Sequence, residues 1–354
     1  MGKTGGLKTM EKYTDYILEQ LQKLLSIDSP TGYTKNVTDY LMDEYKAMGY
    51  LPTQTVKGGV LVDLGGKNAD NAVFLEAHVD TLGAIVTEVK ANGRLAISPL
   101  GGMNANNAEG ENCKIITRFS GTYEGTCQLC NASIHVNGKY DETSRNFDVM
   151  EIVPDEKVFS KTDTEALGIM TGDIVCFCPR TTITKSGFIK SRFLDDKLSA
   201  AILMGYAKYL KEKDNQICPE RKLYQHFTVY EEVGHGGSAS IPEGVTEVLS
   251  VDMGCVGDGL NCKEHQVSIC AKDSGGPYNY QLVSDLISAA KNAGVDFAVD
   301  VYPHYGSDAE AALRAGYDVR HGLIGAGVYA SHGYERSHVE GVQNALLLLK
   351  SYLG

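Results

Sequence analysis

Helix-forming and strand-forming patterns alternate near both ends of this chain, and this alternation restricts its fold more than any other feature. Apolar residues recur with the 3.6-residue period of a helix over residues 11–25, and a second helix is predicted over 34–48. Two short apolar runs at 59–63 and 72–77, separated by a glycine turn, are typical of strands. Helices that alternate with strands predict an α/β sheet with helices on both faces.

The stretch of residues 83–185 interrupts this pattern. It has short alternating segments, frequent glycine and asparagine, and almost no helical period, which predicts an all-β insert. The α/β pattern then resumes with a helix over 195–211, strand-like runs at 227–230 and 248–251, and helices over 279–293 and 341–353. We therefore predict a discontinuous α/β domain of residues 1–82 and 186–354, into which residues 83–185 are inserted as a second domain.

Charge and hydropathy exclude two classes of partner. The chain of 354 residues has 33 basic and 45 acidic side chains, a net charge of −12, and no cluster of lysine or arginine that could follow phosphates. Neither nucleic acid nor an anionic membrane is therefore an expected partner. No apolar run approaches the roughly 18 residues of a spanning helix, and no secretory leader pattern is present. We expect a soluble, cytoplasmic protein.

The nine cysteines are an odd number without dense spacing, which is typical of a reducing compartment. Cys127 with Cys130 and Cys176 with Cys178 form two local pairs that together could hold a structural zinc ion. The gap between the pairs is far longer than in a compact zinc ribbon. Ordinary reduced thiols are the favoured interpretation.

Acidic and imidazole side chains stand where predicted strands end. His78 and Asp80 close one strand, Glu231 and Glu232 close a second, and Asp252 closes a third. Because the carboxyl ends of strands form the ligand crevice of an open α/β sheet, these groups can converge. A single carboxylate at such a position could equally cap a turn.

Two further groups strengthen the case for a shared metal site. Asp195 opens a predicted helix, and His338 directly precedes the last one. Together with the strand-end groups they make the mixture of imidazole and carboxylate that zinc, cobalt or manganese prefers. In this hypothesis the carboxylate of Asp80 orients His78, because a metal-bound imidazole usually donates its other N–H to a carboxylate that fixes its tautomer.

The adjacent carboxylates Glu231 and Glu232 predict a division of work. Two neighbouring carboxylates repel each other unless cations or protons intervene, so one could bind a metal while the other activates water. A solvated acidic turn is the alternative interpretation.

Five motifs resemble, in order, those of the tetrahedral (TET-type) aminopeptidases, a family also labelled glutamyl aminopeptidase and, from an older assignment, endoglucanase. The motifs are Ala77-His78-x-Asp80-x-x-Gly83, Ser191-Arg-Phe-Leu-Asp195-Asp-Lys, Glu231-Glu232-Val-Gly234, Val251-Asp252-x-Gly254 and Arg336-Ser-His338. The resemblance implies a mixed-sheet α/β/α zinc-peptidase catalytic domain with an inserted all-β dimerisation domain. It also implies dimers that assemble into a dodecamer.

The resemblance further implies a centre of two divalent metal ions, zinc or else cobalt or manganese, with Glu231 left free as the general base. The implied ligands are Asp195 as the bridge, His78 and Asp252 at one ion, and Glu232 and His338 at the other. Such a centre would release the N-terminal residue of short peptides, with the free α-amino group bound at one metal.

Two segments depart from the family's pattern. The family's Gly-Thr-Asp-Ala loop is replaced by Gly-Ser-Asp308-Ala, where Asp308 is a predicted substrate-pocket residue. The usual approach to the last ligand is replaced by residues 329–338, which contain two histidines. We favour His338 as the ligand because it directly precedes the terminal helix, and we assign His332 a supporting or substrate-facing position.

Three other functions remain open from the sequence. A carboxypeptidase or deacylase of a related two-metal fold would clamp a substrate carboxylate instead of the α-amine. A glycosidase would need a pair of carboxylates acting without metal. A catalytically silent assembly or binding protein would keep the fold but bind no metal.

Overall fold

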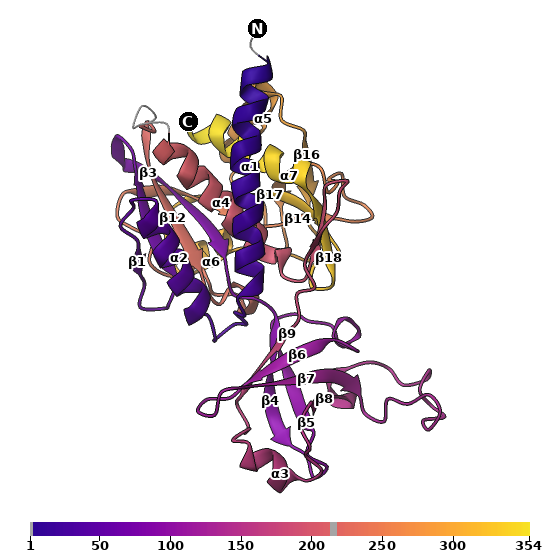
Figure 1. Cartoon of the computed structure of the whole chain (residues 1–354). Coiled ribbons are helices and arrows are strands. Elements are labelled where there is room, and N and C mark those ends of the chain that lie inside the picture. The colour runs from indigo at the N-terminus through magenta and orange to yellow at the C-terminus, as the bar shows by residue number, and fades with distance from the viewer. Residues whose placement is uncertain (1–2, 213–217) are drawn as a thin grey trace.

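The structure, a computed structural model, describes residues 3–212 and 218–354. A large body of helices packed on a sheet has a smaller module of strands below it (Figure 1). The chain leaves the body for the module after β3 and returns after β9, so the first and last parts of the chain build the body together. The predicted α/β fold with a β-rich insert is confirmed.

A mixed β-sheet lies at the centre of the body. In order across the sheet, the strands are β1 (Thr53–Gln54), β2 (Val60–Gly65), β12 (Arg221–Thr228), β3 (Asn68–His78), β13 (Val245–Val251), β17 (Arg320–Tyr329), β18 (Glu335–His338), β11 (Phe188–Ser191) and β10 (Thr182–Ile183). Further strands β14 (Gly254–Val256), β15 (Val267–Lys272) and β16 (Phe297–Val301) extend it beside β17. Neighbours among β12, β3, β13 and β17 are parallel, whereas β1 with β2 and β11 with β18 are antiparallel.

Helices cover both faces of this sheet. The helices are α1 (Lys3–Ser26), α2 (Lys35–Ala47), α4 (Leu194–Glu212), α5 (Tyr280–Ala293), α6 (Asp308–Arg314) and α7 (Val339–Leu353). Because successive side chains of a strand point to opposite faces, β3 contributes to two cores. Val73 and Leu75 join the large apolar cluster with residues of α1, α2, α4, α5 and α7, whereas Phe74 joins a small cluster with Val248 and Ala309 of α6.

The long helix α1 illustrates how an apolar stripe determines packing. Tyr13, Ile17, Leu21 and Leu24 recur at helical spacing and are almost fully buried. The stripe lies against α4, where a Cβ on Gly205 would stand 2.3 Å from a side-chain carbon of Ile17. Gly205 therefore allows the two helices to approach closely.

The inserted module is a closed antiparallel barrel. Its strands, in order around the barrel, are β4 (Gly83–Val89), β5 (Leu95–Leu100), β8 (Met150–Pro154), β7 (Thr122–Leu129), β6 (Asn112–Ile116) and β9 (Ile174–Phe177). The module also contains the short helix α3 (Lys161–Ala166) and the 3₁₀ turns η1 (Ala105–Asn107) and η2 (Phe147–Val149). Helix α3 is a feature that the weak helical period of this stretch does not predict.

Parallel pairing brings the predicted strand ends to one edge of the sheet. Thr228, the last residue of β12, pairs with His78, the last residue of β3. Strand β13, which ends at Val251, runs parallel to β3 on its other side. The 3₁₀ turn η3 (Glu231–Val233) and Asp252 therefore follow strands that end at the same edge.

In the part of the chain that the structure describes, no helix is both long and apolar enough to cross a membrane.

Candidate functional site

Imidazole and carboxylate side chains gather at this edge of the sheet. Nε2 of His78 lies 3.0 Å from Oδ1 of Asp195 and 3.7 Å from Oε2 of Glu231. Two overlapping groups each offer three ligand atoms within 4.8 Å of one another, namely His78 with Asp195 and Glu232, and His78 with Asp196 and Asp252. Asp196, which the sequence did not single out, therefore belongs to the same buried group.

Asp80 holds the site together in a different way from the one predicted. The backbone carbonyl of Asp80, rather than its carboxylate, is the closer acceptor for Nδ1 of His78, at 2.9 Å against 3.7 Å. The carboxylate instead accepts the backbone N–H groups of Glu231 and Glu232, at 3.1 and 3.4 Å, and the hydroxyl of Thr31. Asp80 thus orients His78 through its main chain and the glutamate turn through its side chain.

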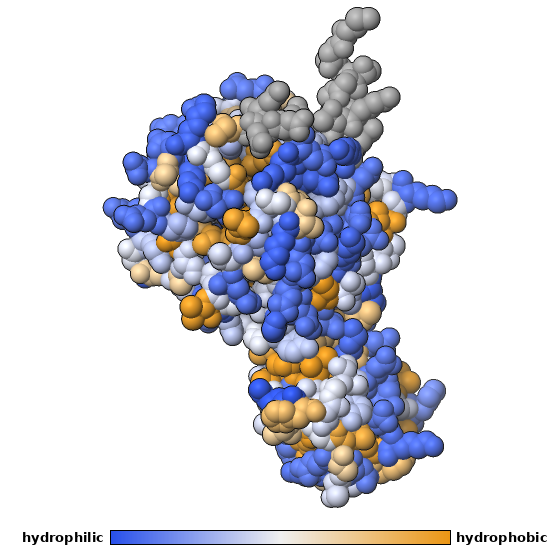
Figure 2. Space-filling model, turned by 60° about the vertical axis from the view of Figure 1, so that its left-hand side comes forward, coloured by the Kyte–Doolittle hydropathy of each residue, from blue (hydrophilic) through white to orange (hydrophobic). Residues whose placement is uncertain are grey.

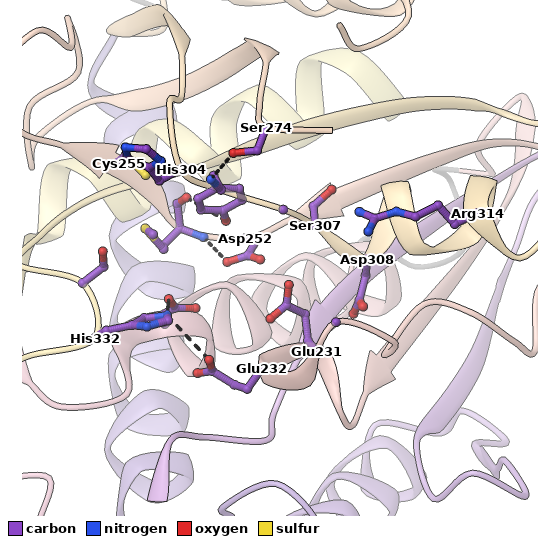
Figure 3. A pocket seen from close by; sticks show the side chains of 16 residues that line it. Glu231, Glu232, Asp252, Cys255, Ser274, His304, Ser307, Asp308, Arg314 and His332 are labelled. Carbon is purple, nitrogen blue, oxygen red and sulfur yellow. Dashed lines mark hydrogen bonds and ion pairs between the residues drawn. The ribbon is translucent and has the colours of Figure 1, made fainter. Parts of the chain in front are cut away.

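The glutamate turn has a strained backbone. Tyr230, immediately before Glu231, has a φ of +77°. A left-handed conformation at such a residue costs about 1–3 kcal/mol and persists only where the surroundings hold it. The two hydrogen bonds to Asp80 supply that restraint. The side chains of Glu231 and Glu232 both line the cavity, where Figure 3 shows them.

Asp195 and Asp196 occupy non-helical backbone at the start of α4. The N–H of Asp195 donates to Oε2 of Glu335 at 3.1 Å, which fixes its place between the strand ends. Oδ2 of Asp196 accepts the N–H of His78, whereas its buried Oδ1 has no hydrogen-bond partner among the described residues. A buried carboxylate oxygen without a partner is costly, and a nearby cation would offset that cost.

The structure brings His332, and not His338, to these carboxylates. Nε2 of His332 lies 3.5 Å from Oδ2 of Asp195 and 3.5 Å from Oε2 of Glu232 (Figure 3). His338 instead caps α7 by accepting the N–H of Glu340, and its Nε2 lies 2.9 Å from the carbonyl of Ser186. The recorded contacts of His338, which we predicted as the ligand, are therefore those of a helix cap, whereas the imidazole that lies beside Asp195 and Glu232 is that of His332.

A cavity of about 620 Å³ opens over the group. Asp308, predicted as a pocket residue, lines it beside Glu231, at the N-terminus of α6 (Figure 3). Oδ1 of Asp308 accepts the N–H of Gly237 at 2.6 Å, and Oδ2 accepts the hydroxyl of Thr228. Other lining residues that the sequence did not single out are Ser274, His304, Tyr305 and Arg314. Ser274 lies in a loop without a motif, whereas His304, Tyr305 and Arg314 lie close in sequence to Asp308, whose segment was the available signal for them.

The sequence over residues 58–348 matches the family model of the M42 glutamyl aminopeptidases. The chain belongs to this M42 family. A Bacillus subtilis protein named "Putative aminopeptidase YhfE" is 44% identical over 338 residues, which cover 95% of the M42 chain and 96% of the relative. The predicted resemblance to TET-type aminopeptidases is confirmed, and membership makes this chain a metallo-aminopeptidase.

Solved structures have the same fold. An aminopeptidase of the archaeon Desulfurococcus kamchatkensis superposes on the M42 chain with a TM-score of 0.86 at 22% identity, covering 96% of this chain and 95% of its own. The TET1 peptidase of Pyrococcus horikoshii, which can assemble into a tetrahedron or a large octahedral shell, gives a TM-score of 0.83 at 21% identity, covering 95% and 98%. Both contain the inserted module within the aligned length.

The electrostatics of the M42 site favour bound cations. Burial and then the charge of Asp195 raise the pKa of Asp252 to about 7 and that of Glu335 to about 8. Burial also raises the pKa of Glu231 and of Glu232 well above the ordinary range. So many buried carboxylates stay ionised together only if positive charge lies among them, and the imidazole and carboxylate donors fit a divalent metal.

Asp195 differs from its neighbours. Burial opposes its ionisation, but hydrogen bonds with His332 and His78 outweigh that effect and lower its pKa below the ordinary value. It is therefore the carboxylate that stays charged most readily in this group, because two imidazoles form hydrogen bonds with it. M42 peptidases are metal-dependent, and this group is where the chain could hold its metal. Among the described residues, no group of three or more potential metal ligands includes a cysteine of the two local pairs or any other cysteine.

Proposed function

We propose that this protein is a two-metal aminopeptidase that removes the N-terminal residue of short peptides. One observation carries the proposal: the two carboxylate oxygens of Asp195 face different imidazoles. Oδ1 lies 3.0 Å from His78, and Oδ2 lies 3.5 Å from His332. This arrangement supports Asp195 as the bridge, with His78 and Asp252 at one ion and Glu232 and His332 at the other. Zinc is the proposed metal, and cobalt or manganese suits the same ligands.

Glu231 is the proposed general base. Two divalent ions in this group would lower the pKa of a water molecule and polarise the scissile carbonyl. Glu231 faces the cavity next to His78, and its backbone is held by Asp80, so its carboxylate can take a proton from water there. The same carboxyl group would then donate that proton to the leaving amine.

Asp308, which lines the cavity beside Glu231, is the proposed contact for the substrate. Its carboxylate accepts two hydrogen bonds from the protein, and a carboxylate has further lone pairs available. The charge of Asp308 favours a cationic group such as a peptide α-amine. Hydrogen bonds from Thr228 and Gly237 already determine the direction of the Asp308 side chain. In this proposal the metal ions therefore provide the main contact with the substrate, and Asp308 provides an additional one.

We also propose that the inserted module mediates self-association of this chain. It exposes large apolar side chains, among them Phe119 at 90% and Phe159 at 81%, and Figure 2 shows apolar areas on its surface. Such exposure is typical of an interaction surface. Dimers that build a dodecamer, in the cytoplasm, are the assembly we propose. One solved neighbour is a dodecamer named PhTET1-12s, with a TM-score of 0.81 at 20% identity over 94% of this chain.

The domain division is also a proposal. Residues 1–82 and 186–354 would form the catalytic domain, with residues 83–185 as the insert. Strand β10 (Thr182–Ile183) lies inside the range 83–185, yet it pairs with β11 of the main sheet. We therefore propose that the insert ends before β10.

A comparison of free and blocked substrates tests the function. Aminoacyl p-nitroanilides should be hydrolysed and their N-acetylated counterparts should not, because the proposed site binds a free α-amine. A chelator should abolish the activity, and added zinc, cobalt or manganese should restore it. Release of acetate from the N-acetylated compounds, without release of p-nitroaniline from the unblocked ones, would indicate a deacylase instead. Activity on a glycan that survives chelation would indicate a glycosidase, and no activity with any metal would indicate a silent protein.

A further inference from the structure

A loop of the inserted module, residues 101–111 between β5 and β6, reaches into the candidate metal site. The carbonyl oxygen of Gly102 lies 3.1 Å from Nδ1 of His332, and Nδ2 of Asn107 donates to the carbonyl of His332 at 3.2 Å. We propose that this insert loop positions His332 and thereby sets the affinity for the second metal ion. The inference rests on the proposed two-metal function and adds positioning residues from the other module.

The contact with Gly102 determines which nitrogen of His332 is free. A carbonyl oxygen only accepts hydrogen bonds, so Nδ1 must carry the proton that it donates to Gly102. Nε2 faces Asp195 and Glu232, 3.5 Å from each, and is the nitrogen that could bind a metal ion once it gives up its proton. A second hydrogen bond of this kind is what usually orients a metal-binding imidazole. The acceptor for His332 therefore comes from the insert, whereas the acceptor for His78 comes from the catalytic body.

The backbone at His332 also depends on the insert loop. His332 lies at the tip of the hairpin between β17 and β18, and both His332 and Ala330 have a φ near +60°. Such conformations need restraint from their surroundings. On one side the N–H of His332 donates to Glu335 at 3.0 Å, and on the other its carbonyl accepts from Asn107. The insert thus supplies a hydrogen bond to the backbone of this hairpin tip, at the carbonyl of His332.

Glycine at two positions allows the loop and the hairpin tip to pack this closely. A Cβ on Gly102 would lie 2.9 Å from Nδ1 of His332, and one on Gly333 would lie 3.2 Å from Nδ2 of Asn107. The φ of Gly102 is not in the left-handed region, so its backbone conformation does not require glycine. Space beside the imidazole is what glycine provides at position 102.

The same loop is tied to the segment that carries Asp195. Arg192, three residues before Asp195, donates to the carbonyl of Asn107, and its Nε and a terminal nitrogen donate to Glu111 at 3.1 and 2.9 Å. Arg192 and Glu111 are both buried. The insert loop is therefore not a loose neighbour of the site, because a buried ion pair anchors it to the catalytic body.

Two substitutions test the proposal on the full-length protein. Asn107→Ala removes the donor to the carbonyl of His332, and Gly102→Ala pushes against its imidazole. Metal binding is measured by calorimetric titration of chelator-treated protein with zinc. The first ion should bind within about threefold of its normal affinity, whereas the second should bind about 10- to 100-fold more weakly, the usual effect of losing a group that orients a ligand.

Matched controls lie in the same module. Asn137 also donates from Nδ2 to a carbonyl, that of Asn131 at 3.1 Å, and a Cβ on Gly138 would meet nothing within 4 Å. Asn137→Ala and Gly138→Ala should therefore leave both affinities unchanged. Circular dichroism and thermal unfolding in the presence of a chelator establish that each variant is folded. If Asn107→Ala does not fold, the metal affinities of Gly102→Ala alone test the proposal.

The outcomes separate this inference from the proposed function. If unmodified protein binds two ions and both variants bind them as tightly, the insert loop does not position His332, although the two-metal function stands. If both ions are weakened equally, the loop acts on general stability and the inference is wrong. If unmodified protein takes up no ion, the proposed function itself fails.

Discussion

Replacement of Glu231 by glutamine should lower kcat by about a hundred- to ten-thousandfold while both metal ions stay bound, because this is the usual contribution of a general base. Glutamine keeps the size of the side chain but cannot take up a proton. The hydrogen bond from residue 231 to Asp80 uses the backbone N–H, so the substitution leaves the turn intact. The measurement is kcat on an aminoacyl p-nitroanilide together with the metal content of the purified protein.

Glu243→Gln provides the matched control, since Glu243 is an exposed glutamate of the loop before β13. It should have the kcat of unmodified protein. Retention of more than about one tenth of the activity in Glu231→Gln would remove Glu231 from the mechanism, given the hundredfold minimum expected of a base. Loss of metal from this variant would instead make Glu231 a ligand.

Alanine at His332 and alanine at His338 should have opposite effects. His332→Ala removes a proposed ligand, so one of the two ions should be lost and kcat/KM should fall by more than about a hundredfold, beyond the effect of losing an orienting group. His338→Ala should keep both ions and nearly full activity. It should reduce stability by about 1 kcal/mol, because His338 accepts a hydrogen bond at the N-terminus of α7. Metal analysis, steady-state kinetics and chemical unfolding measure these effects.

The reverse result would contradict the assignment. If His338→Ala loses a metal ion while His332→Ala keeps both, His338 is the ligand. The pair of variants is well matched, because the two imidazoles lie six residues apart on the same hairpin and its following helix.

Regular elements with long periodic patterns could be predicted from the sequence. The apolar stripe of α1 and the strand runs at β3 and β13 depend on local spacing, which the chain displays directly. The convergence of His78, Glu231 and Asp252 could also be predicted, because parallel strands bring their carboxyl ends to one edge. Short α6 could not, since seven residues give too little periodicity.

The exact partners of the site residues could not be predicted, because they depend on contacts between distant segments. The sequence Ser337-His338 ahead of a helix fits a metal ligand and a helix cap equally well, and only the position of the hairpin decides between them. Asp80 next to His78 indicates an orienting role, but its bonds to the glutamate turn depend on the register of β3 with β12. The reach of Asn107 to His332 depends on how two modules pack.

The central claim is that two metal ions lie on either side of Asp195. Crystals grown with zinc and measured by anomalous diffraction at the zinc edge test it most directly. Two peaks per chain are expected, one against His78 and Asp252 and the other against Glu232 and His332. A single peak, peaks only at the cysteines, or no zinc at this edge of the sheet would contradict the two-metal mechanism.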